Sequence, residues 1–145
     1  MSALALGAGI GQGEIDASEL CDYFLERIER IDTEHNIYLR TTPERARTEA
    51  AAAAERARQG LRLSPLDGVP ISWKDLYDTA GDVTSHGAKV LQERVAVKDA
   101  TVVARATKAG LVCLGKTNQT EFAVSILGIN PNYGTPANPF DDNVA

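Results

Sequence analysis

The fold is decided by residues 66–78, which read Leu-Asp-Gly-Val-Pro-Ile-Ser-Trp-Lys-Asp-Leu-Tyr-Asp. Under the two-residue period of a strand, Val69, Ile71 and Trp73 lie on one face, and Lys74 lies on the other. The run 69–76 is therefore predicted to be a strand that carries a lysine. A lysine in such a run either reaches water or loses its proton, and a lysine without its proton is a base.

Two helices are predicted before this strand. The first begins after Asp16, which forms a capping box with Glu19, and its apolar side chains recur at helical spacing: Leu20, Phe24, Ile28 and Ile31. The second begins with Thr42 and Pro43 and ends at Gly60 in a left-handed cap. Residues 1–13 contain four glycines that do not form a dinucleotide-binding pattern, and they are expected to be a flexible arm.

After the strand, the sequence predicts one more helix and one more strand. Asp99 is expected to cap a helix that ends at Gly110, and residues 111–115 form a short apolar run typical of a strand buried on both faces. Asn118 and Glu121 form a possible capping box for a short helix through Phe122. Residues 128–145 read as turns. A helix, a tight glycine and a buried strand make an α/β unit.

Composition is that of an ordinary globular protein. The 145 residues are 43% hydrophobic and 24% charged, with a net charge of −5. The negative charge argues against direct binding of nucleic acid or of an anionic membrane. The amino terminus has no positively charged region and no apolar run long enough to cross a membrane, so the cytoplasm is the expected location. Cys21 and Cys113 are expected to be buried and reduced, and neither lies in a metal-binding spacing.

Several ordered motifs resemble the amidase signature family. Residues 66–76 resemble its lysine motif, commonly Leu-x-Gly-(Ile/Val)-Pro-x-x-x-Lys-Asp. Residues 109–118, followed by Glu121-Phe122-Ala123, resemble its Gly-Lys-Thr-Asn…Glu-Phe segment. Asn132-Tyr133-Gly134 and Asn138-Pro139 resemble the turns that lead to its serine-rich core, and the helix after Asp16 resembles its opening helix. The resemblance covers nearly all of residues 15–139.

The resemblance implies a fold and a chemistry. The fold would be α/β, with helices packed on a mixed sheet, and residues 14–145 would be the N-terminal portion of an amidase signature domain. Such enzymes hydrolyse amides without a metal or organic cofactor, by a Ser–cis-Ser–Lys triad in which a neutral lysine activates the nucleophilic serine through a bridging serine. Lys74 matches the lysine, and Phe122 and Ala123 match a segment that lines the substrate pocket. From spacing alone, Lys74 would be a solvated lysine or one paired with Asp75 or Asp78, and Phe122 and Ala123 could equally be core residues.

The family's two serines are expected beyond Asn138-Pro139, and the sequence ends at Ala145. Ser72, Ser85 and Ser125 lie outside the serine motifs. The chain is therefore expected to hold one member of the triad, to be inactive alone, and to associate with itself or with a C-terminal part of the enzyme. The expected partner is a small-molecule amide. Two alternatives remain: a glutaminase or transamidase subunit of a tRNA-dependent amidotransferase, and a non-catalytic truncated product.

Overall fold

The computed structural model describes residues 1–138 and residue 140, and the turns predicted at Pro139 and at 141–143 lie outside them. The elements, in chain order, are α1 (Ala3–Gln12), α2 (Ala17–His35), β1 (Tyr38–Thr41), α3 (Pro43–Gln59), β2 (Pro70–Lys74), η1 (Lys89–Leu91), α4 (Thr101–Lys108), β3 (Val112–Thr117) and η2 (Glu121–Ala123). This is the α/β arrangement that the sequence predicts.

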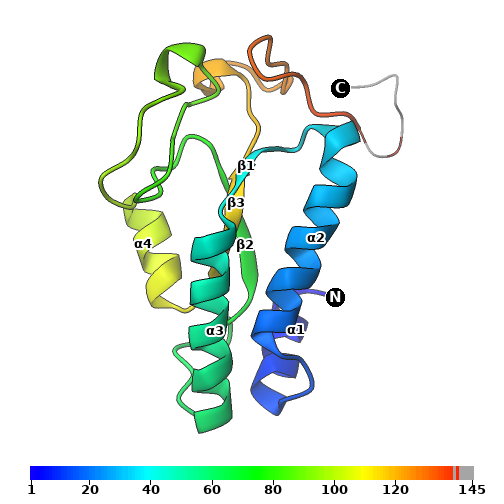
Figure 1. Cartoon of the computed structure of the whole chain (residues 1–145), viewed down its shortest axis with the longest axis vertical. Helices are drawn as coiled ribbons and strands as arrows, with labels where there is room; N and C mark the ends of the chain where they lie inside the picture. The colour runs from blue at the N-terminus through cyan, green and yellow to red at the C-terminus, as the bar shows by residue number, and fades with distance from the viewer. Residues whose placement is uncertain (139, 141–145) are drawn as a thin grey trace.

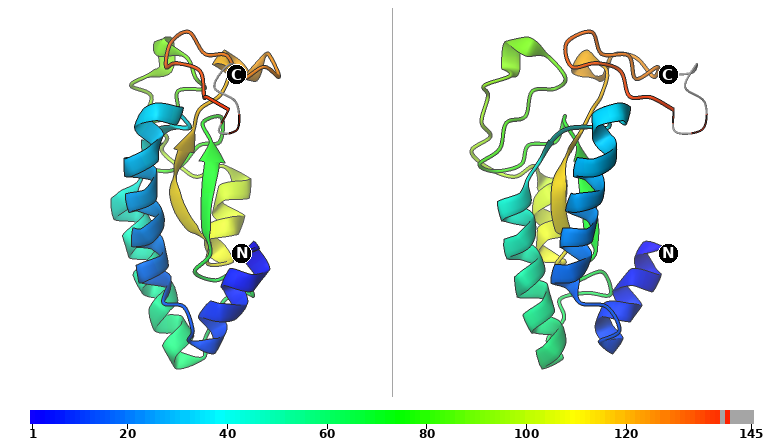
Figure 2. Two further views of the ribbon diagram at one scale, coloured as in Figure 1. Left: turned by 90° about the vertical axis from the view of Figure 1, so that its right-hand side faces the viewer. Right: turned by 45° about the vertical axis from the view of Figure 1, so that its right-hand side comes forward.

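The described residues form a three-stranded mixed sheet in the order β1-β3-β2. The central strand β3 runs parallel to β2 and antiparallel to β1. Helices α2 and α3 cover one face of the sheet, and α4 covers the other (Figures 1 and 2). β3 is buried on both faces, as its continuous apolar run predicts.

The side chains of β3 divide between the two layers. Val112 and Leu114 pack against α2 and α3, in a cluster with Cys21, Leu25 and Ile28. Cys113 faces the α4 side, in a cluster with Trp73 and Val103. Trp73 is therefore a core residue, and both cysteines are free and buried as predicted.

The predicted caps at Asp16 and Gly60 are confirmed, whereas the bond from the Asp16 N–H to the Glu19 side chain that would complete a capping box is not among the hydrogen bonds of the described residues. The Asp16 carboxylate accepts hydrogen bonds from the backbone N–H groups of Ser18 and Glu19 at 2.7 and 3.2 Å. At the end of α3, Gly60 has a φ of +70°, which is the predicted left-handed cap. Of the predicted stripe on α2, Ile28 is buried, whereas Leu20, Phe24 and Ile31 are half-buried; Cys21 and Leu25 complete the buried face of the helix.

Residues 1–13 do not form the expected unstructured arm, because Ala3–Gln12 is helix α1. Ser2 caps its start through a hydrogen bond from Ala5 N–H. Gly7 and Gly9 are buried: a Cβ on Gly7 would overlap the carbonyl oxygen of Pro65, and a Cβ on Gly9 would lie 2.7 Å from the Ile15 Cδ1 atom. These glycines permit close packing of the helix, whereas their number in the sequence had predicted flexibility.

Two predicted helix caps are wrong. The Asp99 carboxylate binds the Arg45 guanidinium and the Ala80 N–H, so α4 begins after Ala100 without a side-chain cap. The helix predicted through Phe122 is only the 3-10 turn η2. Asn118 instead donates to the carbonyl oxygens of Asn36 and Gly134, which ties β3 to neighbouring loops. In the described part of the chain, no helix is both long and apolar enough to cross a membrane.

Candidate active site

Lys74, the predicted catalytic lysine, is the last residue of β2 and is exposed. It lies at the end of the sheet where the parallel strands β2 and β3 both finish, and the loops that follow them gather there (Figure 1). Ligands in α/β proteins bind beyond the carboxyl ends of parallel strands. The position of Lys74 is therefore a suitable one for chemistry, and in the described residues its side chain reaches water.

The register places Lys74 on the α2 side of the sheet. Lys74 is opposite Thr117 in β3, which in turn is opposite Tyr38 in β1. Two residues earlier on the same face, the Ser72 hydroxyl forms a hydrogen bond with the Tyr38 hydroxyl. Burial raises the Tyr38 pKa, although the hydrogen bond with Ser72 acts in the opposite direction, so Tyr38 stays protonated at neutral pH.

Asp75 and Asp78, the two carboxylates that could have paired with Lys74, bind other cations. Asp78 forms two hydrogen bonds with the Arg94 guanidinium, at 2.7 and 2.9 Å. Asp75 is fully buried, and its Oδ1 atom lies 3.1 Å from both Arg40 Nη1 and Lys116 Nζ. The alternative of an ion pair for Lys74 is thus wrong for these two residues, and the solvated alternative describes Lys74 in this structure.

Lys116 is a second lysine of this region, and its role was not predicted from the sequence. It is fully buried and donates to the Thr84 hydroxyl at 2.9 Å, in addition to its contact with Asp75. Burial lowers the Lys116 pKa, while the charge and hydrogen bond of Asp75 oppose that shift. The available signal was a lysine that directly extends a buried strand after Gly115, since such a lysine needs a buried anion.

Irregular pairing around β3 turns Arg40 and Lys116 toward Asp75. Ile71 is opposite Cys113 but Ser72 is opposite Gly115, so β3 has an extra residue, Leu114, at this point. This bulge puts Lys116 on the same face as Trp73 rather than in the α2–α3 layer. β1 has its own irregularity between Tyr38 and Arg40, and it brings Arg40 onto the face of Lys116. The group formed by Arg40, Asp75, Thr84, Ser85 and Lys116 is termed the Asp75 cluster below.

Phe122 and Ala123, the predicted substrate-binding residues, lie in η2 in the loop after β3. Both are exposed and both have left-handed backbone angles, with φ of +52° and +56°. They are therefore not core residues within the described structure. The Phe122 N–H donates to the His86 carbonyl oxygen at 2.8 Å, which brings η2 to the loop that carries the Asp75 cluster. The structure thus places them at the same end of the sheet as Lys74.

Ser72, Ser85 and Ser125, the serines considered from the sequence, each form a hydrogen bond through the hydroxyl. Ser85 is buried, and its hydroxyl and its N–H both donate to Asp75. The Ser125 hydroxyl accepts from the Leu127 N–H. No hydrogen bond joins Lys74 to a serine within residues 1–138, so the described part of the chain holds the candidate base without a nucleophile.

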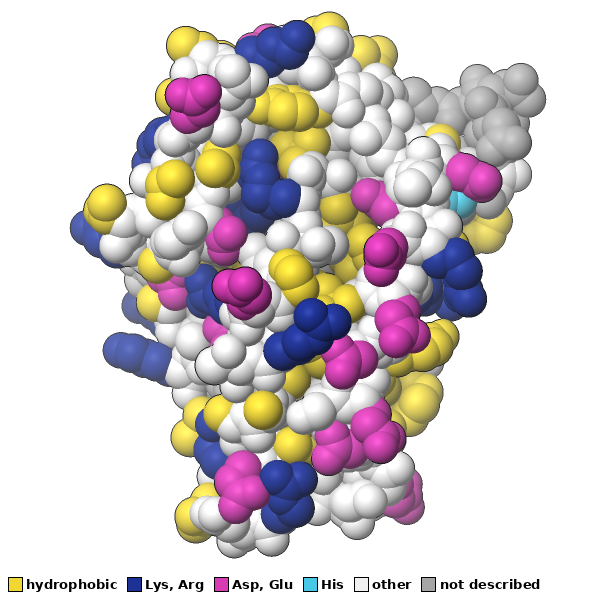
Figure 3. Space-filling view, in the orientation of Figure 1, with side chains coloured by type: hydrophobic (Ala, Val, Ile, Leu, Met, Phe, Trp, Pro, Cys, Tyr) yellow, Lys and Arg dark blue, Asp and Glu magenta, His cyan; other side chains and the backbone are white. Residues whose placement is uncertain are grey.

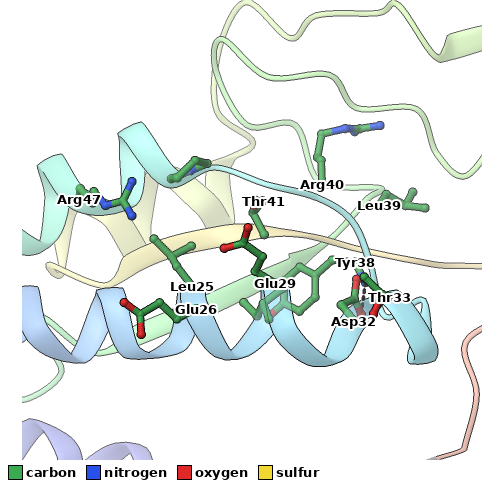
Figure 4. Close-up of a pocket in the computed structure, with 12 residues that line it drawn as sticks. Leu25, Glu26, Glu29, Asp32, Thr33, Tyr38, Leu39, Arg40, Thr41 and Arg47 are labelled. Carbon is green, nitrogen blue, oxygen red and sulfur yellow. Dashed lines mark hydrogen bonds between the residues drawn. The ribbon is translucent and has the colours of Figure 1, made fainter.

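A large groove of the described surface lies elsewhere, between α2 and β1. It has a volume of about 570 Å³, and Figure 4 shows Glu26, Glu29 and Asp32 on its α2 wall. Asp32 is committed to the backbone, because it accepts from the Ile37 and Tyr38 N–H groups. Arg40 extends away from this groove (Figure 4), toward Asp75. The groove lacks Lys74, and its Asp32 carboxylate stabilises the turn into β1, so the candidate active site stays at the end of β2.

Comparison with known proteins assigns the family. The family model described as Amidase matches residues 19–145. The chain belongs to the amidase signature family, and it matches an N-terminal part of that fold.

Curated relatives include two bacterial proteins that are each named as a subunit of glutamyl-tRNA(Gln) amidotransferase. The protein from Chromohalobacter salexigens is 43% identical over 136 residues, which are 94% of this chain and 28% of that protein. The protein from Streptomyces coelicolor is 38% identical over 141 residues, which are 97% of this chain and 28% of that protein. The chain therefore spans less than a third of the length of these relatives.

Solved structures share the fold closely. A vestigial protein complex linked to the origins of an s-triazine catabolic enzyme matches with a TM-score of 0.94 and 36% identity, over 98% of this chain and 31% of that one. The native peptide amidase from Stenotrophomonas maltophilia matches with a TM-score of 0.89 and 32% identity, over 99% of this chain and 31% of that one.

Proposed function

We propose that this chain is the N-terminal part of an enzyme that hydrolyses a linear carboxylic amide to an acid and ammonia or an amine, with Lys74 as the general base. One observation carries the proposal: in a chain of the amidase signature family, the lysine of the lysine motif lies exposed at the carboxyl end of β2, where the loops gather. The proposal includes an acyl-enzyme mechanism, in which the serines come from outside the described residues.

The geometry suits a lysine that must work on a hydroxyl supplied by another segment. A general base has to come within hydrogen-bond reach of the proton it takes. Lys74 ends the edge strand β2, and no strand of the described residues covers the outer edge of that strand. A segment that packs against this edge could bring a serine to the lysine and bury it, and burial favours the neutral amine that acts as the base.

The test compares Lys74→Ala with the unaltered protein in the full reading frame that contains this chain. Ammonia release from a panel of simple amides should fall by at least about 1,000-fold, because a triad that loses a member keeps only residual catalysis. Circular dichroism should be unchanged, since Lys74 is exposed. Lys108→Ala, at an exposed position in the last turn of α4, is the matched control and should keep full turnover. Turnover that survives Lys74→Ala would remove Lys74 from the mechanism.

A second candidate is a transamidase subunit that releases ammonia from glutamine for a partner. The observation that favours it is the set of curated relatives named as subunits of glutamyl-tRNA(Gln) amidotransferase. The net charge of −5 and the acidic side chains over α2 (Figure 3) disfavour direct contact with RNA, so a partner would bind the tRNA. Preference for glutamine over other amides in the same assay would favour this candidate, and turnover of peptide or aryl amides without glutamine turnover would exclude it.

A further inference from the structure

The carboxylate of Asp75, the residue that follows Lys74, binds groups on two sides. Asp75 Oδ1 lies 3.1 Å from Arg40 Nη1 of β1 and 3.1 Å from Lys116 Nζ of β3. Oδ2 accepts from the Ser85 N–H at 3.0 Å, from the Ser85 hydroxyl, and from the Gly87 N–H at 3.4 Å. One oxygen thus binds the sheet and the other binds the loop of residues 83–87.

The backbone of Asp75 joins the same two structures. Its N–H donates to the Thr117 carbonyl oxygen of β3 at 3.1 Å, and its carbonyl oxygen accepts from the His86 N–H at 3.1 Å. Arg40 adds a further link, since its Nη1 atom also donates to the Val83 carbonyl oxygen. The end of β2 is consequently fixed on both sides immediately after Lys74.

Asp75 cannot itself touch a substrate, because it is fully buried under the loop and its oxygens are occupied. Its neighbour Lys74 is exposed, and no side-chain hydrogen bond or ion pair within the described residues holds it. The position of its amine therefore depends on the position of its backbone. A displacement of about 1 Å in a catalytic group can lower the rate by about 100-fold. A device that holds the backbone beside the base therefore has a direct effect on the chemistry.

We propose that Asp75 is the positioning residue for Lys74, acting by binding the 83–87 loop to the sheet through the Asp75 cluster. This proposal rests on the proposed function, in which Lys74 is the base. In the cluster, the buried Asp75 carboxylate binds Arg40 and Lys116, which the irregular pairing of β1 and β3 turns toward it. The same carboxylate binds the 83–87 loop and holds it over the end of β2.

The first test is Asp75→Asn in the full reading frame, measured as kcat and KM for ammonia release. An asparagine keeps the size but replaces one acceptor oxygen with an amide donor, so it cannot bind both the loop and the two cations. We expect kcat to fall by about 100-fold, with KM changed by less than about twofold, because the base and not the substrate contacts would be misplaced. Asp78→Asn is the matched control. It removes the ion pair between Asp78 and Arg94, which lies in the same segment between β2 and α4, and it should leave both kcat and KM unchanged.

A second variant separates positioning from simple stability. Asp75→Leu combined with Arg40→Met and Lys116→Met replaces the buried carboxylate and both of its cations by apolar side chains, a change that restores stability in other proteins. The loop would still lack its acceptor, so we expect the thermal midpoint to recover, kcat to stay low, and hydrogen exchange at Ser85, His86 and Gly87 to be faster than in the unaltered protein. Recovery of kcat together with stability would overturn the positioning role.

The outcomes distinguish this proposal from the proposed function. If Lys74→Ala abolishes turnover while Asp75→Asn leaves kcat intact, the base stands and the positioning role is overturned. If Lys74→Ala leaves turnover intact, the proposed function fails, and the positioning role fails with it. Loss of kcat in both Asp75 variants, with KM kept and stability recovered in the apolar variant, is the supporting result.

Discussion

Gly115 lies in the middle of β3 with the backbone of β1 directly beside it. A Cβ atom there would overlap the Arg40 carbonyl oxygen and would lie 2.8 Å from the Thr41 Cα atom. Both neighbours are backbone, so neither can turn away as a side chain would. The absence of a side chain at this residue is what allows β1 to approach β3 at the bulge that orients Lys116.

Gly115→Ala should destabilise the fold by about 3 kcal/mol, because the added methyl group forces a backbone shift in a packed sheet. Chemical denaturation of the chain measures this free energy. Gly11→Ala is the control: its new Cβ meets only the flexible end of Arg62, and alanine favours the α1 helix, so stability should be equal or higher. Equal stability of Gly115→Ala and the unaltered chain would contradict the role given to the bulge.

The two lysines show how far the candidate site could be predicted from single residues. The motif around Lys74 predicted a lysine within a strand over residues 69–76, and the structure has Lys74 as the last residue of the shorter strand β2. Lys116 and its partner Asp75 were not predicted as a buried pair, because their meeting depends on two pairing irregularities that strand alternation does not reveal. Local patterns located the lysine, whereas the charge network around it depends on non-local pairing.

At the scale of elements, the turn between α3 and β2 is fixed by one ion pair, in which the carboxylate of Asp67 is buried and the guanidinium of Arg56 is partly exposed. The Arg56 guanidinium binds the Asp67 carboxylate through Nε at 2.9 Å and Nη2 at 2.7 Å, and the Leu63 N–H also donates to Asp67. Burial by itself raises the Asp67 pKa, but the hydrogen bonds from Arg56 and Leu63 outweigh it, and the pKa lies below its ordinary value. The folded chain therefore favours the charged carboxylate.

This pair predicts a specific response to acid. Since the Asp67 pKa is lower in the folded state, its contribution to stability is complete above the unfolded value of about 3.9 and is lost as the pH falls through the folded value. Asp67→Asn should lower the free energy of unfolding by about 3 kcal/mol at pH 7, by leaving Arg56 without its partner, and should flatten the stability profile below pH 4.

Denaturation measured at a series of pH values checks the Asp67 prediction. Asp22→Asn removes the exposed pair with Arg47 and should have little effect on stability at any pH. An Asp67→Asn profile that stays parallel to that of the unaltered chain in acid would show that Asp67 does not carry this dependence.

Elements with strong local signals were predicted well, and those that depend on tertiary contacts were not. The caps at Asp16 and Gly60 are encoded within a few residues, so α2 and α3 were found. Strand β1 has only four residues and no clean alternation, and it exists because β3 pairs with it. Asp99 was expected to cap α4, but Arg45 from a distant helix competes for its carboxylate.

At the scale of the whole molecule, the layers end in an apolar rim beside the candidate site. Residues 124–129, which follow η2, expose several large apolar side chains, of which the most exposed are Val124 and Ile126 at 81% and 101%. β2 adds an outer edge that has no partner strand in the described residues. Exposed apolar groups and an open edge together are features of an interaction surface.

The 145-residue chain by itself is therefore expected to associate and to show no amide turnover. Light scattering after gel filtration should give a mass that rises with protein concentration. Val124→Ser combined with Ile126→Ser should reduce association, because it removes apolar area from the rim, whereas Val97→Ser, at an equally exposed valine in the loop before α4, should not. A single monomeric mass at all concentrations would contradict this expectation.

The bulge in β3 also constrains how relatives of this chain can diverge. Because of the extra residue Leu114, the side chains of β3 that follow it lie on the opposite face of the sheet from the one that regular alternation would give. A ladder without the bulge would pair Leu114 with Ser72 and Lys116 with Lys74, which would turn the Lys116 ammonium into the apolar layer under α2 and away from Asp75. Deletion of Leu114 would keep Lys116 opposite Trp73 but would remove an apolar side chain from the layer under α2 and α3. Gene copies with that deletion should therefore be eliminated by selection, although a substitution of Leu114 by another aliphatic residue can be inherited.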